Sequence, residues 1–74
     1  MDEMYKGLQA AGFSVMNDKG HCTVCSRSNT AATALVECSD GSYVVFLQGL
    51  FMVQDPFTFE TTAKVIDFLH EWRF

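Results

Sequence analysis

The segment that decides the fold comprises residues 34–47, ALVECSDGSYVVFL. Asp40-Gly41 at its centre is a preferred pair for a two-residue type I′ turn, because both positions of that turn need a positive φ. The apolar and β-branched residues on either side of this pair favour strands. The segment therefore predicts a β-hairpin in which the turn joins two strands, residues 34–39 and 42–47.

The turn also fixes which residues face each other across the hairpin, so that Leu35 faces Phe46 and Glu37 faces Val44. Because side chains alternate between the two sides of a strand, this register sorts them into two faces. The four residues just named form one face, which is too apolar to lie wholly in water. The other face suits a protein core and carries Ala34, Val36, Cys38, Tyr43, Val45 and Leu47.

Strand signals extend the sheet on both sides of the hairpin. Residues 13–16 and 21–26 flank the polar cluster Asn17-Asp18-Lys19-Gly20, which is typical of a turn. Residues 50–54 are largely apolar and continue the sheet if Gln48-Gly49 forms a tight turn. The sequence therefore predicts an antiparallel sheet of four to five strands.

A helix is expected at the N-terminal end of the sequence. Asp2 is a candidate N-cap, and Met4 and Leu8 recur at helical spacing. Gly12 stands where a left-handed C′ residue ends a helix, and Phe13 would be the C″ residue in contact with Leu8.

A second helix is expected at the C-terminal end, with Thr58 or Thr61 as its N-cap and Glu60 in its first turn. We expect Trp72 to be buried on the apolar stripe of this helix. The stripe comprises Val65, Ile66, Phe68, Leu69 and Trp72, and the opposite side carries Lys64, Asp67, His70 and Glu71. The predicted fold is α+β in the order α-β-β-β-β-α, an antiparallel sheet with the N-terminal and the C-terminal helix packed on one face.

The composition predicts one small domain over residues 1–74 and excludes several functions. Of the 74 residues 49% are apolar, a proportion that argues against intrinsic disorder. Nine acidic residues against five basic ones give a formal net charge of -4. Because phosphate binding needs clustered Lys and Arg, we expect no direct binding of nucleic acid. Phe46, Phe51, Phe57 and Phe59 could stack on bases, but the cations that accompany such stacking are missing.

The start of the chain and its cysteines bear on where the protein acts. The acidic start lacks the basic and apolar regions of a signal peptide, and residues 41–54 are too short and too polar to span a bilayer. Three cysteines are an odd number, so that no complete disulfide framework forms within one chain. We therefore expect the protein to act in the cytoplasm of a bacterium or of an infected host cell, with no membrane contact.

A zinc site is the alternative function that the sequence offers. Cys22-Thr23-Val24-Cys25 is a C-x-x-C motif, with His21 beside it and Cys38 further along, and tetrahedral zinc needs four such donors. In a strand, however, Cys22 and Cys25 point to opposite faces and share no ion. We therefore expect structural cysteines, with no metal and no cofactor. A zinc-binding module of His21, Cys22, Cys25 and Cys38 is the alternative.

Side chains suited to catalysis are scarce. Cys25 with His70 is the one conceivable pair of nucleophile and base, with Asp67 as the group that would orient the imidazole. His70 is expected on the solvent side of its helix, and no Gly-rich loop that binds phosphate is present. The sequence predicts no catalytic residue and no enzyme activity.

An excess of apolar side chains is left over once two helices cover one face of the sheet. Large exposed apolar patches on small proteins mark partner sites. We therefore predict a protein-binding module that self-associates as a two-fold dimer through residues 43–53 or, alternatively, binds a different protein on the same strip. The candidate interface residues are Leu35, Val44, Phe46, Phe51, Val53, Asp67 and Glu71.

In size, acidic charge and order of elements, the whole chain resembles small phage-encoded inhibitor proteins, such as anti-CRISPR and other anti-defence proteins. The resemblance involves no shared motif and therefore assigns no functional residue. It implies a non-enzymatic inhibitor or modulator of a host protein complex. Many inhibitors of this class block the nucleic-acid-binding surface of their target. An acidic inhibitor would be steered to a basic surface on that partner.

Overall fold

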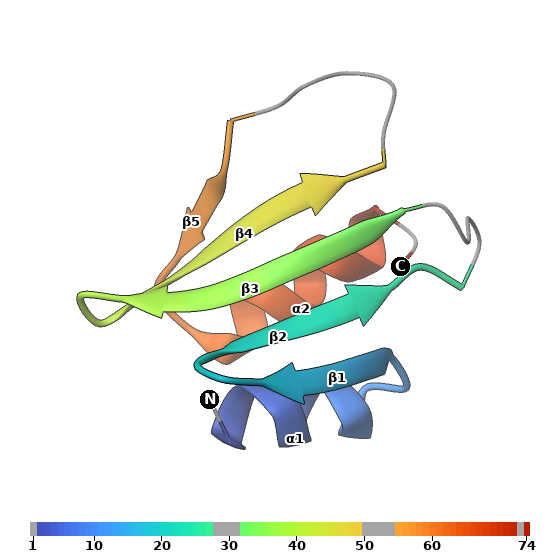
Figure 1. Cartoon of the computed structure of the whole chain (residues 1–74), viewed down its shortest axis with the longest axis horizontal. Helices are drawn as coiled ribbons and strands as arrows, with labels where there is room; N and C mark the ends of the chain where they lie inside the picture. Colours follow the sequence, from blue (N-terminus) through green and yellow to red (C-terminus); the bar gives the residue numbers. More distant parts are fainter. Residues whose placement is uncertain (1, 28–31, 50–54, 73) are drawn as a thin grey trace.

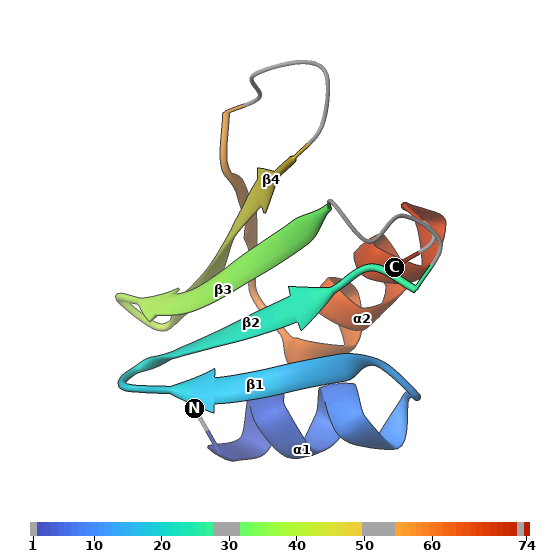
Figure 2. The ribbon, with the colours of Figure 1, turned by 45° about the vertical axis from the view of Figure 1, so that its right-hand side comes forward.

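The computed structural model describes residues 2–27, 32–49, 55–72 and 74. Its elements are α1 (Asp2–Ala10), β1 (Ser14–Asp18), β2 (His21–Cys25), β3 (Thr33–Ser39), β4 (Ser42–Gln48), β5 (Phe57–Phe59) and α2 (Thr62–Glu71). The five strands form one antiparallel sheet in chain order, and both helices pack on the same face of it (Figure 1 and Figure 2). The predicted α+β fold is confirmed.

The β3–β4 hairpin forms as the sequence predicts. Asp40 and Gly41 have φ values of 50° and 79°, the positive values that a type I′ turn needs. Leu35 pairs with Phe46 as expected, and alternate residues of β3 are buried. The predicted register and the predicted division of the hairpin into two faces are both confirmed.

The β1–β2 hairpin differs from the prediction in its turn. β1 continues through Asn17 and Asp18, and Asp18 pairs with His21, so that only Lys19 and Gly20 form the loop. Gly20 has a φ of 78°, which glycine adopts without the steric cost that a side chain brings. Half of the polar cluster therefore belongs to the strand, because a two-residue loop is enough to join antiparallel strands.

The end of α1 is a Schellman motif, as Gly12 predicts. Gly12 has a φ of 93° and donates its backbone N–H to the carbonyl of Gln9 at 3.0 Å. Phe13 donates its backbone N–H to the carbonyl of Leu8 at 3.1 Å. These two bonds satisfy carbonyl groups that the helix end would otherwise leave unpaired. Leu8 and Phe13 are both buried in the core, as their predicted contact requires.

Thr61, and not Thr58, caps α2. The Thr61 hydroxyl accepts a hydrogen bond from the backbone N–H of Lys64 at 3.2 Å, and the backbone of Thr61 is extended. Glu60 therefore precedes the helix, and the expectation that it lies in the first turn is wrong. Thr58 belongs to β5 instead.

Trp72 is more exposed than the apolar stripe of α2 predicts. Val65 and Leu69 on that stripe are 0% exposed, whereas Trp72 is 37% exposed. The expectation that Trp72 is buried is wrong, since α2 ends at Glu71 and Trp72 is the C-cap beyond its last turn.

The fifth strand, β5, occupies residues that the sequence analysis assigned to no strand. Phe57 and Phe59 pair with β4 at the edge of the sheet, directly after Pro56. Residues 50–54, which were expected to form this strand, lie outside the described residues. The alternation Phe-Thr-Phe is a strand signal, and Pro56 is compatible with an edge because proline lacks the N–H that a central strand uses.

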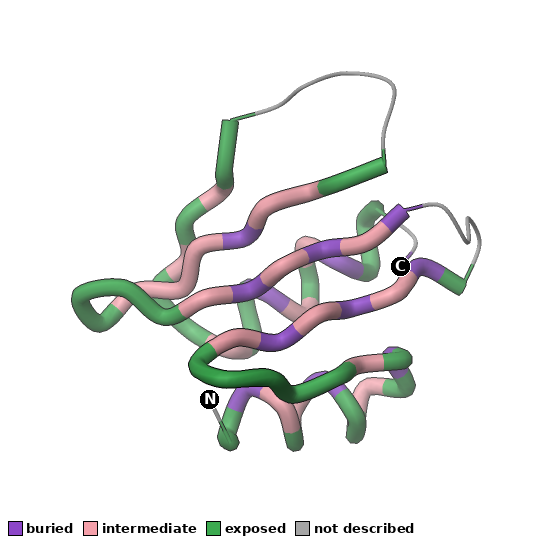
Figure 3. Tube along the Cα trace, viewed as in Figure 1, coloured by how far each residue is buried: buried purple, intermediate pink, exposed green. Residues whose placement is uncertain are grey.

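The core lies between the sheet and the two helices, and Figure 3 shows buried residues alternating along β2 and β3. Its helical side consists of Met4 and Leu8 from α1 with Val65 and Leu69 from α2. The strands contribute Cys22, Val24, Ala34, Val36 and Val45.

A contact between distant parts of the chain closes the core beside the end of α2. The backbone N–H and the Nε of Arg27 donate to the main-chain oxygen of Phe74, at 3.1 and 3.2 Å. The guanidinium carbon of Arg27 lies 5.5 Å from the ring centroid of Phe13, a cation–π distance. Sequence reasoning missed this contact, because no local pattern links residues that stand 47 positions apart.

Candidate protein-binding surface

The face of the sheet that points away from the helices is covered by no other helix or strand of the described residues (Figure 2). We call it the outer face. Strand pairing places Met16, Thr23, Leu35 and Phe46 side by side across β1, β2, β3 and β4. We call these four residues, of which Met16, Leu35 and Phe46 are apolar, the apolar row. Val44 lies next to Phe46 on the same face.

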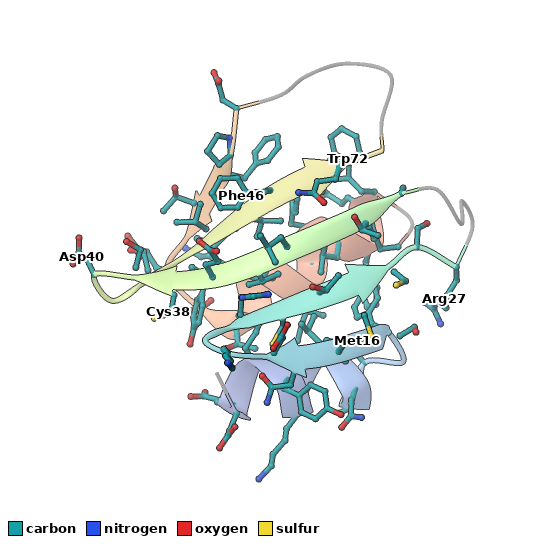
Figure 4. The ribbon with its side chains drawn as sticks, in the orientation of Figure 1. Met16, Arg27, Cys38, Asp40, Phe46 and Trp72 are labelled. Carbon is teal, nitrogen blue, oxygen red and sulfur yellow. The ribbon has the colours of Figure 1, made fainter. Side chains whose placement is uncertain are left out.

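The apolar row is left partly in water. Met16 at one end of the row is 61% exposed. Leu35 and Phe46 are half-buried, because cross-strand neighbours cover part of each side chain. Figure 4 labels Met16 and Phe46 on the sheet in the view in which both helices lie behind it. The outer face therefore presents a strip across four strands that is apolar on β1, β3 and β4 and carries Thr23 on β2.

Polar side chains border the apolar row on both sides. On one side Asp18, His21 and Glu37 occupy neighbouring positions of β1, β2 and β3, and Asp18 Oδ2 lies 4.0 Å from His21 Nε2. On the other side the Thr33 hydroxyl donates to Gln48 Oε1 at 3.4 Å. The strip thus has one border with two carboxyl groups and one border of neutral polar groups.

The structure brings three of the predicted interface residues together. Leu35, Val44 and Phe46 lie side by side on the outer face of β3 and β4. Phe51 and Val53 lie outside the described residues. The described part of the strip is therefore centred on the β3–β4 hairpin.

Asp67 and Glu71, the two acidic residues of the predicted interface, belong to a different surface. They lie on α2, which covers the opposite face of the sheet (Figure 1). Both are exposed, and both line a groove of about 220 Å³. We call it the α2 groove; its lining residues are Phe59, Lys64, Asp67, Phe68 and Glu71.

Sequence reasoning missed Met16 and Thr23 as members of the outer face. Their alignment with Leu35 depends on the register of the β1–β2 hairpin, which follows from its two-residue loop. Gly20 was the available signal, because glycine at the second loop position is compatible with a tight hairpin turn. A two-residue loop at Lys19-Gly20 would have paired Met16 with Thr23.

The three cysteines and His21 do not converge on one point. Cys22 is fully buried on the face that the helices cover, whereas His21 and Cys25 lie on the outer face. Cys38 is exposed near the end of β3 (Figure 4). The predicted placement of Cys22 and Cys25 on opposite faces is confirmed. The described residues contain no group of three or more His, Cys, Asp or Glu side chains placed to hold a metal ion, so the zinc alternative has no geometric support there.

Cys22 is a buried neutral thiol. Its side chain is 0% exposed, and burial raises the pKa of the thiol above its ordinary value of 9.0. A thiol in this setting packs as a small apolar side chain. Cys22 is therefore a core residue without the thiolate character that a reactive cysteine needs.

The candidate nucleophile and base lie on opposite sides of the sheet. Cys25 is half-buried on the outer face, whereas His70 is on α2 with its ring centroid 4.9 Å from that of Phe13. Within the described chain no hydrogen bond or ion pair joins His70 to Asp67. The structure does not assemble the pair on which a thiol enzyme would depend.

No helix among the described residues is long and apolar enough to cross a membrane. Comparison with models of protein families, with curated proteins and with solved structures finds no match to this chain. Its function is therefore argued from its own surface geometry.

Proposed function

We propose that this protein is a non-enzymatic binding module whose outer face docks a partner protein and thereby inhibits or modulates it. The observation that carries the proposal is the apolar row, which crosses four strands and which neither helix covers. Contiguous apolar side chains left in water on a small protein mark an interaction site. The separation of Cys25 from His70 supports a role without catalysis.

The partner carries a basic surface around an apolar patch. Asp18 and Glu37 border the apolar row, and the whole chain has a net charge of -4. Opposite charges at the rim of an interface raise the association rate and exclude wrong partners. The resemblance to phage-encoded inhibitors in size and charge supports the same role, as an inhibitor of a host complex in the bacterial cytoplasm.

A second copy of the chain is the competing occupant of the outer face. A two-fold contact would bury the apolar row against itself. Each copy carries a net charge of -4, so that self-association brings like charges together. A basic partner lacks this penalty, and we therefore assign the outer face to it.

The test compares capture by three immobilised proteins from a lysate of the bacterial host. Met16→Glu places a carboxylate in the apolar row at its most exposed position, where the fold tolerates it. Ala63→Glu places the same charge on an exposed position of α2 and serves as the matched control. A protein rich in Lys and Arg should bind the parent and the Ala63→Glu variant. The same protein should not bind the Met16→Glu variant. Equal capture by all three proteins would show that the outer face is not the interface.

A further inference from the structure

The α2 groove lies between β5 and α2, on the side of the sheet opposite the apolar row. Its volume of about 220 Å³ is below the roughly 300–1,000 Å³ of pockets that hold drug-sized ligands or cofactors. A groove of this size fits one long side chain of a partner. The question is which side chain its lining would hold.

Two phenyl rings line the apolar part of the α2 groove. The ring centroids of Phe59 and Phe68 lie 4.9 Å apart, with an angle of 45° between the ring planes. Phe57 and Trp72 hold Phe68 from its other sides, with centroids 4.7 and 5.9 Å from it. Phe68 therefore packs against three other aromatic rings before any ligand arrives. A cation within about 6 Å of such a ring is attracted by the negative face of its π-system.

The charges of the groove are mainly negative. Asp67 and Glu71 stand one helical turn apart at its rim, and neither forms an ion pair within the described chain. Both lie in the second half of α2, where the helix dipole adds partial negative charge. Lys64 lines the groove one turn before Phe68 and opposes this charge from the N-terminal end. Among the described residues, no cation is paired with these two carboxylates, which can therefore pair with a cation from outside.

From this geometry we infer that the α2 groove is a second binding site, one that takes an arginine side chain of the partner protein. A guanidinium group can lie flat on the ring of Phe59 while its N–H groups donate to Asp67 and Glu71. Lysine offers a point charge without the flat surface and binds less tightly. The inference rests on the proposed function only for the class of partner, a protein with a basic surface.

Trp72 supplies the signal for a direct test. It is the only tryptophan of the chain, and its ring centroid lies 5.9 Å from that of Phe68. The full chain is titrated to millimolar concentration with a capped Gly-Arg-Gly peptide, and with the same peptide carrying lysine or the neutral isostere citrulline. Trp72 emission and calorimetric heat are recorded together. We expect saturable binding of the arginine peptide, weaker binding of the lysine peptide and no binding of the citrulline peptide.

Charge-matched variants locate the site. Asp67→Asn with Glu71→Gln should weaken arginine binding by about ten-fold or more, because two charge-assisted hydrogen bonds are lost. Asp2→Asn with Glu3→Gln removes the same charge from exposed positions of α1 and should leave the affinity unchanged. Lys64→Gln should strengthen binding, because it removes the opposing cation.

The inference is overturned if neither signal saturates, if citrulline binds as well as arginine, or if both double variants weaken binding equally. Met16→Glu, which disrupts the apolar row, should leave the titration unchanged. If the arginine peptide does not bind but capture of the partner still depends on Met16, the α2 groove is not an arginine site and the proposed function stands. If the arginine peptide binds but capture of the partner does not depend on Met16, the proposed role of the outer face is wrong and the arginine site stands.

Discussion

Cys22 shows how one buried group links the stability of the fold to pH. Burial raises the pKa of its thiol above 9.0 in the folded protein, so that the unfolded chain loses this proton at lower pH than the folded chain. The stabilising effect is fully present below about pH 9 and is lost as the pH rises through the folded pKa. We predict that the free energy of unfolding falls above pH 9, and that Cys22→Val makes this fall smaller.

Urea unfolding between pH 7 and pH 11 (about the range in which thiols titrate) measures this effect. Cys38→Ser, which removes an exposed thiol, is the matched control and should keep the pH dependence of the parent. Parent and Cys22→Val curves that run parallel would show that the pKa of the Cys22 thiol is the same in the folded and the unfolded chain, and would contradict this prediction.

Local signals at single residues were the most predictable part of the chain. Gly12 ends α1, and Asp40-Gly41 form the predicted turn, because glycine and a short polar residue are the ones that tolerate positive φ. Trp72 was not predictable, because its exposure depends on where α2 ends relative to the sheet. The contact of Arg27 was missed for a related reason, since its hydrogen-bond partner Phe74 stands 47 positions away in the chain.

Among the elements, α2 anchors the core through its middle turns. Leu69 is 0% exposed, whereas Trp72 is 37% exposed and touches Phe57 and Phe68 at ring-centroid distances of 6.4 and 5.9 Å. Leu69→Ala should therefore cost about 2–5 kcal/mol of unfolding free energy. Trp72→Ala should cost clearly less, because part of its surface already lies in water. Urea unfolding of both variants tests this order, and the reverse order would mean that the last turn of α2 carries the packing.

The start of α2 provides a second test at the scale of an element. Thr61→Ala removes the hydroxyl that accepts the Lys64 N–H, and should cost about 0.5–2 kcal/mol of unfolding free energy. Thr58→Ala, an exposed position in β5, is the control and should cost less. Equal losses measured by urea unfolding would place the cap elsewhere.

Strand signals predicted the sheet better than they predicted the site on it. The Asp40-Gly41 turn was enough to place Leu35, Val44 and Phe46 on one face, because a two-residue loop fixes the β3–β4 register. Met16 joined them only through the β1–β2 register, which the polar residues before Gly20 concealed. The α2 groove was beyond sequence reasoning, because its rings come from two elements that pattern alone does not bring together.

In the whole molecule, two short helices cover one face of a five-stranded sheet, and no other helix or strand of the described residues covers the opposite face. We predict that the protein is monomeric at high micromolar concentration, because its net charge of -4 opposes self-association. Light scattering on the parent and on Phe46→Glu measures this. A dimer that Phe46→Glu dissociates would assign the outer face to a second copy, as the two-fold dimer predicted from the sequence requires.

The most direct test of the binding role is a chemical-shift footprint of the captured partner on the isotopically labelled chain. The probe is the purified partner protein that binds the parent and does not bind the Met16→Glu variant. The account predicts the largest amide and methyl shifts at Met16, Thr23, Leu35 and Phe46, with smaller ones along the α2 groove. Shifts confined to α1 and α2, with the apolar row unchanged, would contradict it.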